Sequence, residues 1–254
     1  MTPMLRQNLT LWILVLIGIN MRPLLTSIGP LLPDIRAASG MSYTLAALLT
    51  ALPVIAMGVL ALAGGWVDRF IGQNRSIALS LLIIAVGALL REIAPHSALL
   101  LSSALAGGIG IGIIQAAIPA VIKRLFTRRT PLVMGLWSAA LMGGGGLGAA
   151  LTPWMASHSA AWHQALAWWA LPALLALVSW LTICRQLPCA PHQHDELPRA
   201  AVFRQRRAWT LGFYFGLINA GYASLIAWLP PYYIQLGDSA QYSGSLLALL
   251  TGGR

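Results

Sequence analysis

The sequence predicts an all-α, polytopic membrane protein, because it is unusually apolar and its apolar residues are gathered in long runs. Of the 254 residues, 58% are hydrophobic and 9% are charged, whereas a soluble domain carries about 25% charged residues. Seven of the runs are close to or longer than the roughly 20 residues that a helix needs to cross the hydrocarbon core of a bilayer. These two observations exclude an ordinary soluble domain.

The expected spanning helices follow one another with mostly short connections. They cover 9–33, 44–64, 76–94, 98–122, 132–155, 165–184 and 209–235. The first run is too long for a signal peptide and contains Pro23, so it is interpreted as a membrane helix. The third ends where Arg91 and Glu92 meet the membrane edge. An eighth apolar stretch, 244–251, is too short to cross a bilayer.

The basic residues predict the orientation of the chain. With a cytoplasmic N-terminus, all of the 16 Lys and Arg residues except Arg22, Arg36 and Arg91 fall on the cytoplasmic side, in accordance with the positive-inside rule. The longest connection, 185–208, is rich in Pro, His and Arg and lacks apolar periodicity, which is typical of a linker. The net charge of +10 therefore reflects topology and does not indicate a nucleic-acid partner.

Short matches indicate an internal repeat. Gly-Ile-Asn at 18–20 is echoed by Gly-Leu-Ile-Asn at 216–219, and Ala-Leu-Leu-Thr occurs at 47–50 and at 248–251, at nearly the same offset. Six helices, a basic linker and a seventh helix that resembles the first are typical of parallel six-helix repeats.

Three parts are expected from this repeat: an N-terminal six-helix bundle over 1–184, a cytoplasmic linker over 185–208, and an incomplete second repeat over 209–254. The chain is then interpreted as a truncated product, with the closing Gly-Gly-Arg as a possible frameshift scar. A genuine seven-helix protein is the alternative.

Arg22 is the main candidate for chemistry, because it lies near the middle of the first run. A cation at that depth is costly and is kept only where it faces a cavity or a partner. Asp34 is about 18 Å further along the helix, too far for an ion pair. Pro23 has no N–H to offer the carbonyl of Ile19, so the helix should bend there. We interpret Arg22 as the site of a small anion; the alternative is a structural arginine bonded to helix-end carbonyls or to a carboxylate from a missing half.

Four further polar side chains are candidates for the same substrate-binding cavity. Asn20 lies beside Arg22, and Gln115 is the one strongly polar side chain of the fourth predicted helix. Asn219 and Tyr222, three residues apart, share a face of the seventh. Gln115 could equally bond a neighbouring helix.

Two glycine clusters, at 107–112 and 143–148, predict unusually close helix packing. Small residues let membrane helices approach each other, and some hinge freedom is expected with them. Cradling of a phosphate is not expected, since a phosphate-binding loop follows a strand.

A charged motif connects the second and third predicted helices. Its key residues are Gly64, Asp68, Arg69, Gly72 and Arg75. It resembles the G-x-x-x-D-R-x-G-R-R loop of major facilitators, although its second glycine comes one residue late and Gln73 and Asn74 replace basic residues. The resemblance implies that Asp68 contacts a neighbouring helix end and that the arginines gate the cytoplasmic face. The alternative is an ordinary turn with an exposed ion pair.

Three longer segments, 16–42, 129–154 and 207–230, resemble the cyanate-transporter branch of the major facilitator superfamily. The resemblance implies a twelve-helix protein of the bacterial inner membrane that moves cyanate, a small monovalent anion, by alternating access. A sister branch resembles exporters of 2-nitroimidazole, so export of a small neutral compound stays open. An inactive truncated remnant is the other alternative.

No enzyme, metal or cofactor is expected from the sequence. It has no G-x-S-x-G motif and no metal-spaced histidines within a predicted helix. Cys184 and Cys189 with His192 and His194 could form a metal site, but a solvated loop is favoured. The expected partners are the anion and the lipid bilayer, with no obligatory protein partner and no nucleic acid.

Overall fold

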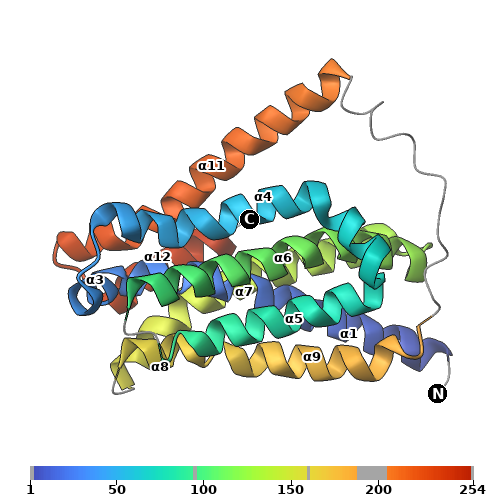
Figure 1. Cartoon of the computed structure of the whole chain (residues 1–254), viewed down its shortest axis with the longest axis horizontal. Coiled ribbons are helices and arrows are strands. Elements are labelled where there is room, and N and C mark those ends of the chain that lie inside the picture. Colours follow the sequence, from blue (N-terminus) through green and yellow to red (C-terminus); the bar gives the residue numbers. More distant parts are fainter. Residues whose placement is uncertain (1–2, 94–95, 159–160, 188–204, 253–254) are drawn as a thin grey trace.

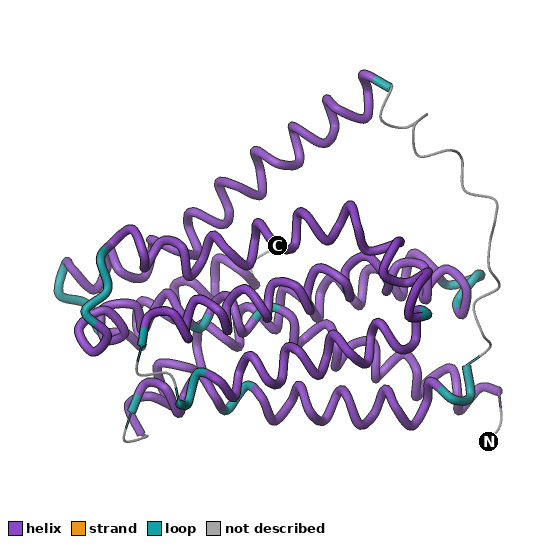
Figure 2. The backbone as a smooth tube through the Cα atoms, viewed as in Figure 1, coloured by secondary structure: helices purple, strands orange, loops and turns teal. Residues whose placement is uncertain are grey.

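The computed structural model describes residues 3–93, 96–158, 161–187 and 205–252, which are almost entirely helical and include no strand (Figures 1 and 2). Seven helices in this part of the chain are long and apolar enough to cross a membrane. The prediction of an all-α, polytopic membrane protein is confirmed.

The helices match the predicted spans, with two of the spans divided. The first span consists of α1 (Pro3–Met21), α2 (Pro23–Thr26) and α3 (Ile28–Ser39). The next four are continuous: α4 (Tyr43–Ile71), α5 (Gln73–Leu90), α6 (Ser97–Leu125) and α7 (Thr130–His158). The sixth is divided into α8 (Trp162–Ala167) and α9 (Ala170–Cys184), and the last two helices are α11 (Arg206–Gln235) and α12 (Ala240–Gly252).

Local sequence explains the turn between the first two spans. Gly40 ends α3 in the left-handed conformation, at φ 64°, and its N–H donates to the Arg36 carbonyl. This is the usual role of glycine after a helix. Ser42 then caps α4, because its hydroxyl accepts a hydrogen bond from the Leu45 N–H.

The spans run back and forth between two sides of a bundle. The side where α1 begins, here called the N-terminal side, also holds the α4–α5 turn and the start of α11, whereas α3 ends on the far side (Figure 1). α1 packs on α7, α6 lies between α4 and α5, and α5 also contacts α9. α12 packs on α7, and α11 touches α3 and α12 but diverges from the bundle towards Arg206 (Figure 1).

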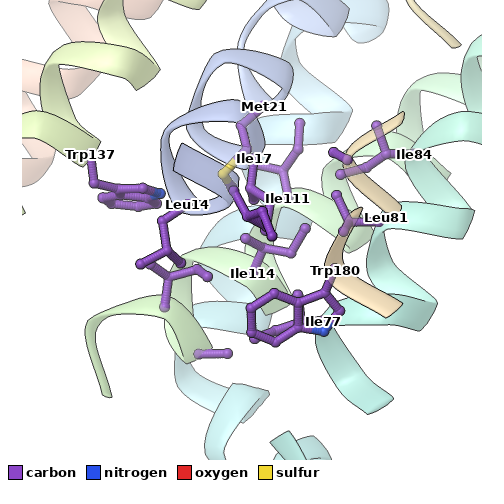
Figure 3. Close-up of a cluster of buried hydrophobic side chains, with 14 of the residues drawn as sticks. Leu14, Ile17, Met21, Ile77, Leu81, Ile84, Ile111, Ile114, Trp137 and Trp180 are labelled. Carbon is purple, nitrogen blue, oxygen red and sulfur yellow. The ribbon is translucent and has the colours of Figure 1, made fainter. Parts of the chain in front are cut away.

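Three apolar clusters form the core of the described residues, and the two larger ones meet near the break in the first span. The larger joins α1, α5, α6, α7 and α9, and it includes Ile17, Leu81, Ile114 and Trp180 (Figure 3). The smaller begins at Ile28 and joins α3 with α4, α6 and α8. Leu24 and Leu25 of α2 still belong to the first cluster, so the change from one cluster to the other falls after α2, at Ser27.

Glycines of α6 allow the tight packing around this helix. A Cβ added to Gly108 would run into the backbone of Pro53 in α4, and one on Gly110 would lie 2.7 Å from the Ser80 carbonyl oxygen of α5. The close approach expected of this glycine cluster is confirmed. Van der Waals contact of this kind is a main source of helix association in lipid.

Candidate substrate site

The first span is broken at the residue that the sequence singled out. α1 ends at Met21, Arg22 has turn geometry, and Pro23 begins the four-residue helix α2. The Arg22 carbonyl accepts hydrogen bonds from the Leu25 and Thr26 N–H groups, at 3.0 and 3.1 Å. The helix is interrupted where a bend was predicted, at the point where Pro23 has no N–H to donate to the Ile19 carbonyl.

The glycines of α7 form the surface on which this break rests. A Cβ added to Gly144 would run into the backbone of Ile19, and one on Gly148 would lie 2.6 Å from the Pro23 Cα. The Thr26 hydroxyl donates a 2.8 Å hydrogen bond to the Gly145 carbonyl. The break is therefore held against α7 by contacts that only glycine permits.

Arg22 points from the break towards α11. Its guanidinium carbon lies 5.6 Å from the centre of the Tyr222 ring, within the range of a cation–π contact. The Tyr222 hydroxyl in turn lies 3.9 Å from the Met142 sulfur of α7. Two predicted site residues that are far apart in the sequence are thus brought together between α1, α7 and α11.

The Arg22 guanidinium has no acidic partner in the part of the chain that the structure describes. Its Nε is buried and forms no hydrogen bond there. A buried cationic donor without an acceptor is costly. An anion placed beside Arg22 and Tyr222 would supply both the charge and the acceptor.

The other three predicted site residues are not joined to Arg22 by any described contact. Asn20 is buried, and its Nδ2 donates a 2.7 Å bond to the Leu16 carbonyl of its own helix. Gln115 is half-buried on the face of α6 that carries Gly108 and Gly112. Asn219 is half-buried in α11 and makes contacts of its own.

Sequence reasoning put Arg91 at the outer membrane edge and did not predict that its side chain is buried. The side chain is only 1% exposed. One terminal nitrogen donates a 3.0 Å bond to the Leu24 carbonyl of α2, and Nε lies 3.4 Å from the Ser103 hydroxyl. Arg91 therefore does what was considered as the alternative for Arg22: it is a structural arginine bonded to a helix-end carbonyl. The available signal was a lone arginine directly after an apolar run.

The charged motif after the second span is mostly helix, which corrects the prediction of a loop. α4 continues to Ile71, so Gly64, Asp68 and Arg69 lie within it. Nothing breaks the helix before Gly72, which ends it at φ 88° and ψ 138°, a conformation that favours glycine. The Arg75 side chain is exposed, and the side chain of Arg69 is not described.

Gln73 and Asn74, which replace basic residues of the motif, bind backbone carbonyls of two neighbouring helices. Gln73 Nε2 donates to the Ala117 carbonyl of α6 at 3.3 Å, and Asn74 Nδ2 donates to the Cys184 carbonyl of α9 at 3.2 Å. The Trp180 indole donates to the Asn74 carbonyl at 3.0 Å. The start of α5 is therefore tied to two neighbouring helices on the N-terminal side.

The buried carboxyl of Asp68 should make the stability of the fold depend on pH. Burial raises the pKa of its carboxyl above the ordinary 3.8, and the Ser76 hydroxyl offsets part of the rise. A raised folded-state pKa gives a stabilisation that is complete below the unfolded-state pKa and is lost as pH rises through the folded-state pKa. Asp68→Asn should therefore raise the unfolding midpoint at neutral pH and change it little in acid.

This prediction is checked by thermal unfolding in detergent from acid to neutral pH. Asp34→Asn is the matched control, because the Asp34 side chain is exposed. Parallel curves for wild type and Asp68→Asn would contradict the prediction.

A cavity of about 650 Å³ lies on the far side, away from Arg22. It is lined by α3, the start of α4 and the end of α11, including Arg36, Tyr43, Trp228 and Tyr232. The Arg36 guanidinium carbon stacks 3.4 Å from the Tyr43 ring centre, and Arg36 Nε donates to the Met41 carbonyl. None of the predicted substrate-binding residues lines this cavity.

The cysteine and histidine cluster of the linker is not described. Cys189, His192 and His194 lie outside the described residues. Cys184 is a free, half-buried thiol whose sulfur donates to the Leu181 carbonyl. In the described ranges, no group of three or more potential metal ligands is found.

Two curated proteins of Escherichia coli (strain K12) are similar to the chain. The cyanate transport protein CynX is 67% identical over 244 residues, which is 96% of this chain and 63% of that protein. A 2-nitroimidazole transporter is 30% identical over 243 residues, covering 93% of this chain and 60% of that protein. The chain thus spans about three-fifths of the length of these relatives.

Solved structures show the same fold. A D-xylose–proton symporter superimposes with a TM-score of 0.72 at 16% identity, over 96% of this chain and 65% of the symporter. A bacterial homologue of the lysosomal transporter Spinster has a TM-score of 0.71, over 98% of this chain and 60% of that protein. The description of the Major Facilitator Superfamily itself matches residues 12–253. With nearly all of its length matched, the chain belongs to the Major Facilitator Superfamily.

Proposed function

We propose that this chain moves a small monovalent anion, cyanate, across the bacterial inner membrane by alternating access, with Arg22 as the binding cation. One observation carries the proposal: the Arg22 guanidinium is set at a helix break, faces Tyr222 and has no acidic partner among the described residues. The 67% identity to CynX supports cyanate as the anion.

The chemistry of cyanate suits this arrangement. The ion is linear, carries one negative charge and can accept hydrogen bonds at both ends. A guanidinium is weakly hydrated and offers several donors in a fixed plane, so it can replace the water that a small anion gives up. Tyr222 adds an aromatic face that holds the guanidinium in place.

Alternating access is supported by the way α11 meets the first span. A Cβ on Gly29 of α3 would lie 2.9 Å from the Ile226 carbonyl oxygen and 3.3 Å from Pro230, so the two helices touch on the far side. The half of α11 nearest the N-terminal side is mostly exposed, with Trp209 64% and Phe213 72% accessible. Contact on the far side of Arg22, with α11 diverging from the bundle on the N-terminal side (Figure 1), suits a carrier open to the N-terminal side.

The proposed topology has the N-terminus in the cytoplasm. The exposed basic residues of the N-terminal side include Arg75, Lys123, Arg128 and Arg129, as the positive-inside rule requires. The proposed domain division is the one expected from the repeat: a six-helix bundle over 1–184, a cytoplasmic linker over 185–208 and a second repeat from 209. Asp68, Arg69 and Arg75 would act at the cytoplasmic gate, and Asn20, Gln115 and Asn219 would line the path.

Uptake of radiolabelled cyanate into proteoliposomes tests the proposal. We compare vesicles that contain the chain, CynX, or a chimera of residues 1–251 joined to the remainder of CynX, each with and without excess 2-nitroimidazole. Saturable cyanate uptake that 2-nitroimidazole does not inhibit supports the proposal. Uptake of radiolabelled 2-nitroimidazole by the same vesicles, without cyanate uptake, supports a carrier of neutral compounds instead. Uptake by the chimera but not by the chain indicates that the chain alone is inactive.

A further inference from the structure

Arg91 stands out because it is a buried charge to which the proposed transport path assigns no role. The side chain is 1% exposed, and no acidic group pairs with it in the described part of the chain. One of its terminal nitrogens is buried without a hydrogen-bond partner. Burying a cation without a counter-ion is expensive, so the contacts that it does make need a reason.

Those contacts fall on the break in the first span. The 3.0 Å hydrogen bond from Arg91 ends on the Leu24 carbonyl, two residues after Arg22. A second, longer bond ties Arg91 Nε to the Ser103 hydroxyl of α6, which itself donates to the Leu100 carbonyl at 2.7 Å. Arg91 therefore links α2 to α5 and α6.

We propose that Arg91 is a positioning residue for the anion site: by holding the Leu24 carbonyl, it fixes the direction in which Arg22 points. The transport role of Arg22 rests on the proposed function, but the Arg91–Leu24 link does not.

The shortness of α2 explains why the hydrogen bond from Arg91 to the Leu24 carbonyl can control the orientation of this helix. Four residues between two breaks are too few to keep a helical orientation by their own hydrogen bonds. The Leu24 side chain packs on Gly107 of α6, whereas the Arg22 Cβ faces Gly145 of α7. The side chains of Leu24 and of Arg22, which precedes α2, thus point towards different helices. A hydrogen bond that holds Leu24 can therefore set the rotation of α2 and with it the direction of the Arg22 side chain.

The strength of the anchor follows from its charge. A guanidinium that donates to a carbonyl forms a stronger hydrogen bond than a neutral donor does. In the apolar surroundings of Leu24 and Gly107, no water competes with it effectively. Loss of this bond should loosen α2 while leaving distant helices unchanged.

Hydrogen–deuterium exchange of the 254-residue chain in detergent tests the link directly. We expect Arg91→Met to increase exchange of backbone amides in 22–28 by about tenfold or more, the size expected when a hydrogen bond to a charged donor is lost. Arg91→Lys, which keeps the charge with fewer donors, should give a smaller increase. Arg128→Met is the control, because Arg128 is exposed beyond the end of α6. Exchange that is unchanged in 22–28, or that rises equally in α9, would overturn the proposal.

A double-mutant cycle on cyanate affinity then separates positioning from general stability. Arg91→Met should weaken binding several-fold in the wild-type background but add nothing in an Arg22→Gln background, because it acts through Arg22. Equal effects in both backgrounds would refute the proposal. If the wild type binds no cyanate, the proposed function fails, whereas the exchange experiment still decides the role of Arg91.

Discussion

Replacing Arg22 with glutamine is expected to weaken cyanate binding by about 10- to 100-fold, the range expected when a hydrogen bond to a charged group is lost. Glutamine keeps polar atoms at the helix break but removes the guanidinium charge that faces Tyr222. The change is measured as the dissociation constant of radiolabelled cyanate in detergent and as the KM of uptake in proteoliposomes.

Two variants make this test specific. Arg22→Lys keeps the charge but loses the planar donor set, so we expect an intermediate affinity. Arg128→Gln removes one exposed positive charge and should leave the affinity unchanged. Binding by Arg22→Gln that is as tight as wild type would remove Arg22 from the substrate site.

Replacing Gly144 with alanine is expected to destabilise the protein by roughly 1–3 kcal/mol, which is typical of overpacking a tight contact. The new Cβ would run into the carbonyl and Cα of Ile19, so backbone would have to move on both sides. Because Ile19 is the residue whose carbonyl loses its donor at Pro23, the movement would reach the break itself. The unfolding midpoint in detergent should fall.

Gly143→Ala is the matched control for this prediction. Gly143 belongs to the same helix and the same glycine run, but a Cβ added there meets nothing within 4 Å. Its midpoint should stay unchanged or rise slightly, because alanine is the better helix former. If both variants behave alike, the close contact between α1 and α7 does not hold in solution.

The lengths of the apolar runs predicted the spans well but not the extent of each helix. The seven expected spans correspond to the seven apolar helices, and Pro23 predicted the break that divides the first. The helix of the second span was expected to end at residue 64 but continues to Ile71, beyond the apolar span of Tyr43–Ala61, since Gly64 and Gly65 are compatible with an α-helix. The helix ends at Gly72, which has a positive φ. A glycine in the sequence permits this backbone conformation but does not show that it is adopted.

The candidate site was predicted in part. Arg22 was identified by its depth in an apolar run, and Tyr222 by its place on the polar face of the seventh span. Their contact could not be derived, because it depends on how α11 crosses the first span. The burial of Arg91 could not be derived either, because its position after an apolar run does not reveal that neighbouring helices enclose the side chain.

The sequence by itself determined the class of protein, the number of apolar spans, the cation near the middle of the first span and the proline that breaks that span, since each depends on local composition and hydrogen-bonding capacity. Only the tertiary structure decided which side chains meet. It set Gly144 against Ile19, Tyr222 over Arg22 and Arg91 on the Leu24 carbonyl. These contacts depend on the relative rotation and crossing of whole helices, which arise from packing between segments far apart in the chain.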